Sequence, residues 1–173
     1  MHYPIIVSIL LASVLQAGCS ADFNWREASL PPTPLRGLFP CKPERAQRNV
    51  VLAGASLDLH MASCSTAGVT TAIGHARLPS SDISGAVLGQ WRQATLQTMT
   101  ARDVVEQPLV LVGVRVEPGA LQLQAFGKGP DGKPLTLRAA WFAQGSTAFV
   151  AMVFGEQLSA DIAETFFSGL RLP

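Results

Sequence analysis

Alternation of apolar and polar positions is the main signal in the body of the chain. Between Ser56 and Ser63, the residues Leu57, Leu59 and Met61 share one side and Asp58, His60 and Ala62 the other. A period of two is typical of a half-buried strand. Comparable runs, separated by Gly- and Pro-containing turns, predict strands at 35–39, 45–53, 56–63, 69–78, 109–116, 121–126, 135–142 and 147–154. The last of these is the most apolar, so we expect it at the centre of the sheet.

Two segments have a helical period instead. Apolar residues recur at helical spacing over 83–99, and Ser81 or Asp82 can cap that helix. A second, shorter helix is predicted over 159–167, with Ser159 as its cap and Gly169 as its end. Runs of strands interrupted by helices predict an α+β domain. We expect an antiparallel β-sheet of about six to seven strands, flanked by two helices.

The predicted turn at Ala67-Gly68 fixes the register of the strands around it. In that register His60 lies opposite His75, and Asp58 lies opposite Arg77. Opposed histidines can hold a metal ion or relay a proton. The alternative is a solvated sheet face with a cross-strand Asp58–Arg77 pair that contributes under ~1 kcal/mol. We favour the solvated face, because no third metal ligand is evident, and assign no metal site.

The start of the chain has the character of an export signal. The apolar run over 5–14 is too short to cross a bilayer as a helix, which needs ~20 residues. The stretch 14–20 resembles the lipobox of bacterial lipoproteins. That resemblance implies cleavage after residue 18 and lipidation of Cys19, and Ser20 after the cysteine implies the outer membrane. Ordinary signal-peptidase cleavage or an uncleaved anchor stays open as an alternative.

The sequence predicts three segments along the chain. We predict a signal peptide over 1–18, a proline-containing tether over 19–34 and a single domain over 35–173. If Cys19 carries lipid, Cys41 and Cys64 remain as a pair in an oxidising compartment, which favours a disulfide. Such a bond would contribute ~3 kcal/mol in the chain-entropy model. The alternative is two separate buried thiols.

Composition and motifs exclude several classes of function. Thirteen basic and twelve acidic residues give a net charge of +1, and no basic block offers a nucleic-acid surface. The chain has no Gly-x-Ser-x-Gly motif. The glycine-rich stretch 127–134 lacks the Gly-Lys-Ser/Thr ending of a phosphate loop, so it is read as a hairpin. We therefore assign no catalytic residue and no cofactor, and we do not expect an enzyme.

Three short stretches resemble the PsbP/Mog1-like proteins. They are 38–44, 71–79 and the closing 166–172, and the resemblance spans most of the predicted domain. It implies an antiparallel sheet flanked by helices. Members of that family are mostly accessory or binding proteins, and a fold alone does not assign a function.

These observations lead to one main expectation about function. The chain is expected to be an envelope lipoprotein on the periplasmic face of the outer membrane, or soluble in the periplasm if Cys19 is not acylated. It would be a non-enzymatic accessory protein that binds an envelope protein or a small apolar ligand, and not nucleic acid. One alternative is a periplasmic metal-binding protein or hydrolase that uses His60, His75 and Asp58. Another is a purely structural component, which predicts no apolar pocket between the sheet and the long helix.

Overall fold

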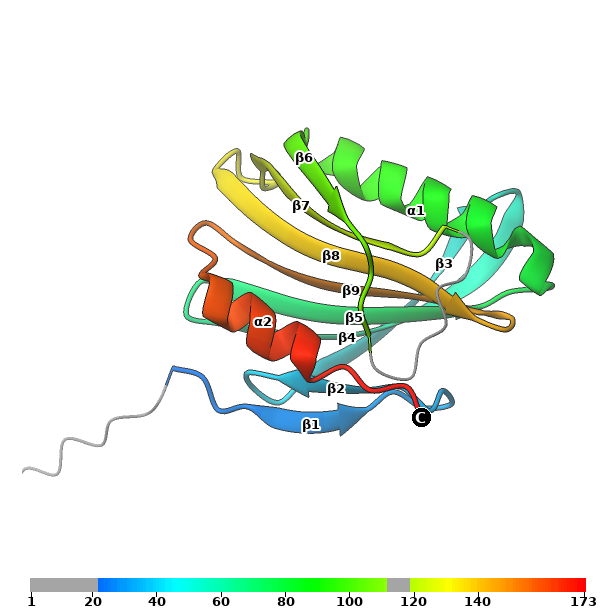
Figure 1. The fold of residues 1–173 in the computed structure, drawn as a ribbon, viewed down its shortest axis with the longest axis horizontal. Helices are drawn as coiled ribbons and strands as arrows, with labels where there is room; N and C mark the ends of the chain where they lie inside the picture. The colour runs from blue at the N-terminus through cyan, green and yellow to red at the C-terminus, as the bar shows by residue number, and fades with distance from the viewer. Residues whose placement is uncertain (1–21, 112–118) are drawn as a thin grey trace, which may run out of the picture.

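One large antiparallel sheet dominates the molecule (Figure 1). The computed structural model describes residues 22–111 and 119–173. Seven strands pair in the order β3-β4-β5-β9-β8-β7-β6. The strands are β3 (Glu44–Leu52), β4 (Ala55–Thr66), β5 (Val69–Arg77), β6 (Arg102–Gln107), β7 (Leu121–Lys128), β8 (Pro134–Gln144) and β9 (Thr147–Gly155). The α+β prediction is confirmed, and the apolar β9 occupies the central position expected for it.

Two tight turns set the register of the first three strands. Ala53-Gly54 and Ala67-Gly68 each have two successive positive φ angles, of 50° and 74° and of 48° and 75°. Two-residue turns of this kind match the twist of the flanking strands. The predicted turn at 67–68 is confirmed. The first turn consists of Ala53 and Gly54, because Leu52 pairs with Ala55.

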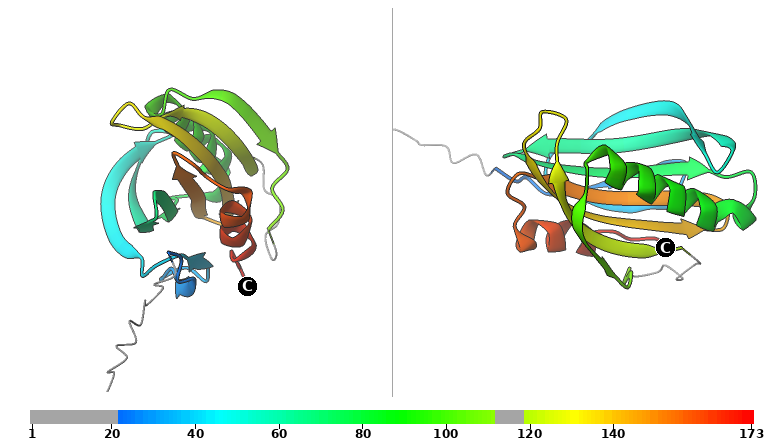
Figure 2. Two further views of the ribbon diagram at one scale, coloured as in Figure 1. Left: turned by 90° about the vertical axis from the view of Figure 1, so that its left-hand side faces the viewer. Right: turned by 90° about the horizontal axis from the view of Figure 1, so that it is seen from above.

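Helix α1 (Ser84–Thr98) covers part of one face of the sheet, as Figure 2 shows from above. A short 3-10 turn, Ser81–Ile83, leads into it. The sequence suggested Ser81 or Asp82 as the cap, but the Ser80 hydroxyl accepts the hydrogen bond, from the Asp82 amide at 3.2 Å. The cap is thus Ser80, one residue before the first predicted position, and it caps the 3-10 turn rather than α1 itself.

A second layer covers the opposite face (Figure 2). It consists of the hairpin of β1 (Arg26–Ser29) and β2 (Arg36–Phe39) with helix α2 (Ala160–Ser168). The predicted cap is confirmed, since the Ser159 hydroxyl accepts from the Ile162 amide at 3.4 Å. Phe39 of the hairpin and Phe166 of α2 meet edge to face at 6.4 Å, with both rings fully buried. Each sheet face therefore has its own hydrophobic core.

The segment predicted as a tether, 19–34, belongs to the fold for much of its length. Residues 26–29 form β1, and Leu30 is 1% exposed. Phe23 and Trp25 stack on each other at 6.1 Å and pack against the same core. The prolines lie in the loop that joins β1 to β2. A hydrogen bond from the Leu30 amide to the Leu35 carbonyl closes this loop. Prolines occur in tight connections as well as in linkers, so the proline content of this segment could not distinguish the two.

The prediction of a strand at 109–116 was wrong for the residues that the structure describes. Leu109–Leu111 lie outside any strand, and 112–118 fall outside the described residues. The strand at this edge of the sheet is instead β6, which was not predicted. All six of its side chains are exposed, so it carries no apolar alternation.

A disulfide joins Cys41 to Cys64 and confirms the predicted pairing. Cys41 follows the hairpin and Cys64 lies on β4, so the bond ties the hairpin layer to the sheet. The other predicted site residue of this type, Cys19, lies outside the described residues.

We predict that replacing both Cys41 and Cys64 by alanine lowers the free energy of unfolding by about 3 kcal/mol. The two cysteines are 23 residues apart, and the cross-link restricts the unfolded chain by that amount in the chain-entropy model. Urea unfolding of the wild type and the double variant measures the difference. Adding reductant should lower the free energy of unfolding of the wild type to that of the variant and leave the value for the variant unchanged. Equal midpoints for oxidised wild type and variant would contradict the prediction.

Candidate functional site

An apolar cavity of about 720 Å³ lies between α1 and the sheet. Its size falls within the ~300–1,000 Å³ of typical ligand pockets. The sheet supplies the floor through β4, β8 and β9, and α1 supplies one wall. The apolar side chains that line it are Leu59, Met61, Trp91, Ala94, Met99, Pro130, Leu135, Leu137, Met152 and Phe154, with Ala46 at the β3 edge.

The sequence of α1 explains why the cavity exists. The side chains that seat the helix on the sheet, Val87, Leu88 and Trp91, all come from its first half. One turn further on, the positions facing the sheet are Ala94, Thr95 and Thr98. These small side chains fill less space than Val87, Leu88 and Trp91, and the cavity lies beside them. Met99, just past the helix, is buried again and closes the gap.

Methionines give the cavity an adaptable lining. The chain has four methionines; one is Met1 and the other three, Met61, Met99 and Met152, all line the cavity. Met61 lies across Gly74 of β5, where a Cβ atom would collide with its sulfur. Unbranched methionine side chains fill irregular spaces and adjust to different ligands. The site is therefore suited to an apolar ligand of flexible or variable shape.

Polar groups are confined to a few positions around the cavity. Thr95 and Thr98 donate their hydroxyl protons to helix carbonyls, of Trp91 at 3.0 Å and of Ala94 at 2.8 Å. Arg48 of β3 and Lys128 of β7 are the two charged residues that line it, and both are exposed. Among the described residues, no carboxylate lines the cavity. The site can hold an apolar molecule, but it has no acid–base pair for catalysis.

The histidine pair lies on the other face of the sheet. His60 and His75 are direct cross-strand partners, as predicted, and their rings stack at 5.0 Å with an angle of 7° between planes. They border a smaller cavity of about 280 Å³ beside Pro31 and Arg45. The nitrogen lone pairs of imidazole lie in the plane of the ring. In two parallel stacked rings they therefore lie in separate planes and do not converge on one metal position.

The remaining members of the predicted polar cluster do not complete a metal site. Asp58 accepts a hydrogen bond from Asn49 Nδ2 at 3.2 Å, away from the histidines. Within 22–111 and 119–173, Asp58 and Arg77 form no ion pair, and no three His, Cys, Asp or Glu side chains converge as metal ligands. The geometry therefore gives no support to hydrolysis or metal binding by His60, His75 and Asp58.

His75 has a lowered pKa. Only 5% of it is exposed, and this burial lowers its pKa below the ordinary value of 6.5. The positive charges of His60 and Arg45 lower the pKa as well, while a hydrogen bond to the Pro31 backbone opposes them. A neutral His75 therefore belongs to the folded state.

We predict that this histidine makes the fold less stable in mild acid. Unfolding restores the ordinary pKa, so below about pH 6.5 the unfolded chain binds more protons than the folded one. The stabilisation is complete above that pH and is lost as the pH falls through the lowered pKa of His75. Melting temperatures of the wild type and of His75→Gln, measured from about pH 8 to about pH 5, test this prediction. The melting temperature of the variant should fall less over this range than that of the wild type. His60→Gln is the control and should keep most of the wild-type dependence, since burial is the larger cause. An unchanged pH dependence in His75→Gln would refute the assignment.

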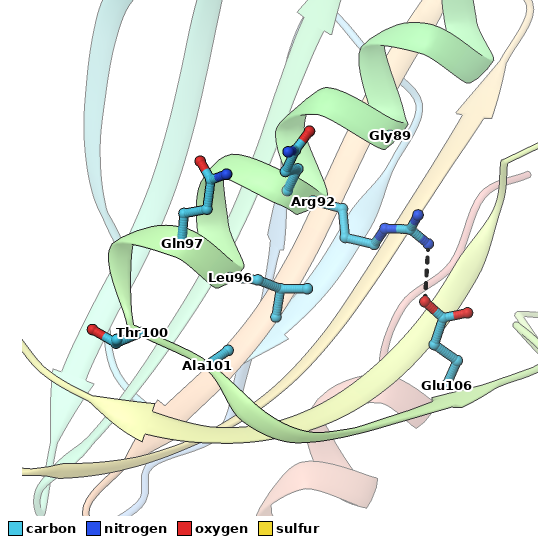
Figure 3. A pocket seen from close by; sticks show the side chains of 8 residues that line it. Gly89, Arg92, Leu96, Gln97, Thr100, Ala101 and Glu106 are labelled. Atoms are coloured by element: carbon cyan, nitrogen blue, oxygen red, sulfur yellow. Dashed lines mark hydrogen bonds and ion pairs between the residues drawn. The ribbon is translucent and has the colours of Figure 1, made fainter.

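A second cleft, of about 780 Å³, runs along the other side of α1 (Figure 3). Arg92 reaches from the helix across this cleft to Glu106 of β6, at 3.1 Å. Gln93, Gln97 and Thr100 add further polar groups. The ion pair holds the helix to the edge strand, and as a mostly exposed pair it contributes up to about 1 kcal/mol. Its polar, open lining makes this cleft a weaker candidate than the methionine-lined cavity.

Sequence reasoning did not identify the residues of the apolar cavity. Met61 was placed on the apolar side of its strand, while Met152 and Arg48 received no role. A usable signal was present, namely the change from large to small side chains on the sheet-facing stripe of α1 after Trp91. Only the pairing of distant strands shows which residues form the floor beneath it.

Comparison with known proteins gives no independent indication of function: no protein-family model matches the chain, and no similar sequence is found among curated proteins. Within the described residues, no helix is long and apolar enough to span a membrane.

Proposed function

We propose that the protein is a non-enzymatic binding protein that holds a small apolar ligand in the cavity between α1 and the sheet. One observation carries this proposal: an apolar cavity of about 720 Å³ is already formed, with three methionines in its lining. Ligand sites are concave, largely apolar and few per protein. A purely structural component predicts no such pocket, so the cavity favours the binding function.

Partial burial of the floor supports the same conclusion. Met61, Met152 and Phe154 are only half-buried, although they lie on inner strands of the sheet and face α1. A side chain such as Phe gains about 1.5–3 kcal/mol from full burial. A ligand that covers these residues would gain that apolar contact without rearranging the fold.

We further propose that the protein acts in the bacterial envelope, anchored by lipid on Cys19 or soluble in the periplasm. The lipobox-like stretch 14–20 suggests this address. The Cys41–Cys64 disulfide supports it, because such bonds persist in oxidising compartments. The fold class is compatible with the PsbP/Mog1-like resemblance and with its accessory role.

Filling the cavity tests the binding function. We expect Ala94→Trp to weaken binding of the neutral fluorophore N-phenyl-1-naphthylamine at least about tenfold, because an indole would occupy the site. Gln93→Trp is the matched control: Gln93 is exposed like the neighbouring Ala94, but it lines the cleft on the other side of α1 and not the cavity. It should bind as the wild type does. Titrations followed by probe fluorescence, with melting curves to confirm folding, provide the measurement. No binding by the wild type, or equal binding by both variants, would refute the proposal.

The proposed anchor is tested by intact mass of the protein extracted from membranes. We expect a mass that corresponds to cleavage before Cys19 with added acyl chains, and two daltons less than the reduced form because of the disulfide. Cys19→Ser should abolish the acylated species and release the protein from the membrane fraction. A Cys19→Ser variant that stays membrane-bound, or an unacylated wild type, would exclude the lipid anchor.

A further inference from the structure

We infer that the ligand of the apolar cavity is a free single-chain amphiphile with an anionic head, a long-chain carboxylate, whose head group lies at Arg48. This inference rests on the binding function proposed above and specifies its ligand. The chain would lie on the floor of the cavity and the carboxylate at its β3 edge.

The shape of the floor fits a chain. Apolar residues cross the sheet in a stripe, from Leu59 and Met61 on β4 to Met152 on β9 and Leu137 on β8. Between them lies Gly74 of β5, and the side chain of Met61 occupies the space above this glycine. Four neighbouring strands span about 14 Å at the usual spacing. The space is therefore elongated along the sheet rather than round.

Charge at the two ends of the stripe favours an anion. Arg48 lies on the edge strand β3, and Lys128 lies at the end of β7 beyond β8. In the described parts of the chain, neither forms an ion pair, whereas Arg36, Arg92 and Lys133 each have a carboxylate partner. With no carboxylate in the lining, the potential in the cavity mouth is positive.

The two cations are not equivalent. Lys128 is next to the C-terminal end of α1, since its amide donates to the Met99 carbonyl at 2.8 Å. A helix C-terminus carries roughly half a negative charge, which disfavours an anion there. Arg48 lies on a strand, away from this effect, and its guanidinium can bind a carboxylate with two parallel hydrogen bonds. The head group is therefore assigned to Arg48.

Three probes with the same alkyl chain test the inference: dodecanoate, dodecyl maltoside and dodecyltrimethylammonium, each below its micelle concentration. Their affinities come from displacement of the neutral fluorophore. We expect dodecanoate to bind most tightly, and high salt to reduce its advantage. In Arg48→Gln, dodecanoate should bind about three- to fivefold more weakly, the upper range for an exposed ion pair, while the maltoside is unchanged.

Lys128→Gln is the matched control, because it removes one positive charge from the same cavity at its other end. It should weaken dodecanoate binding less than about twofold. Equal affinities for dodecanoate and the maltoside, tighter binding of the ammonium probe, or a loss in Lys128→Gln as large as in Arg48→Gln would overturn the inference. If the wild type binds the fluorophore but not dodecanoate preferentially, only the ligand class fails. If it binds none of the probes, the proposed function fails with it.

Discussion

Incomplete coverage of one sheet face is the constraint on which the site depends. A sheet with apolar side chains on both faces must bury both against other elements. The hairpin, α2 and the C-terminal residues cover one face with large side chains such as Phe39 and Phe166. On the other face α1 buries Val87, Leu88 and Trp91, while the small residues Ala94, Thr95 and Thr98 line the space that follows them. The uncovered remainder of that face is the methionine-lined cavity.

The two faces have different mechanical roles as a result. A disulfide fastens the hairpin layer through Cys64, and a buried, neutral His75 packs beneath the hairpin connection. In contrast, the C-terminal half of α1 is held by the Arg92–Glu106 pair, by Met99 and by the partly buried Leu96. An exposed ion pair contributes far less than a cross-link. The rigid face can therefore maintain the sheet while the α1 face adjusts to an occupant.

The sequence allowed much of this fold to be predicted, for identifiable reasons. Period-two alternation located seven of the nine strands in the described residues, and the Ala67-Gly68 turn placed His60 opposite His75. Edge strand β6 was missed because its side chains are all exposed, and β1 because the prolines that follow it suggested a tether. The cavity could not be predicted in this way. Its floor combines β4, β8 and β9, and their spatial order follows from long-range pairing rather than from any local pattern.

Charge and shape together narrow what the cavity can hold. An apolar trough alone would accept many molecules, because methionine linings discriminate poorly. A cation at its rim adds a directional interaction that does not require the rest of the ligand to fit closely. Arg48 can provide this because it lies on edge strand β3, where its side chain stays in solvent beside the buried Leu59. Specificity for a head group and tolerance for the chain behind it thus come from two separate features, an exposed edge and an adaptable floor.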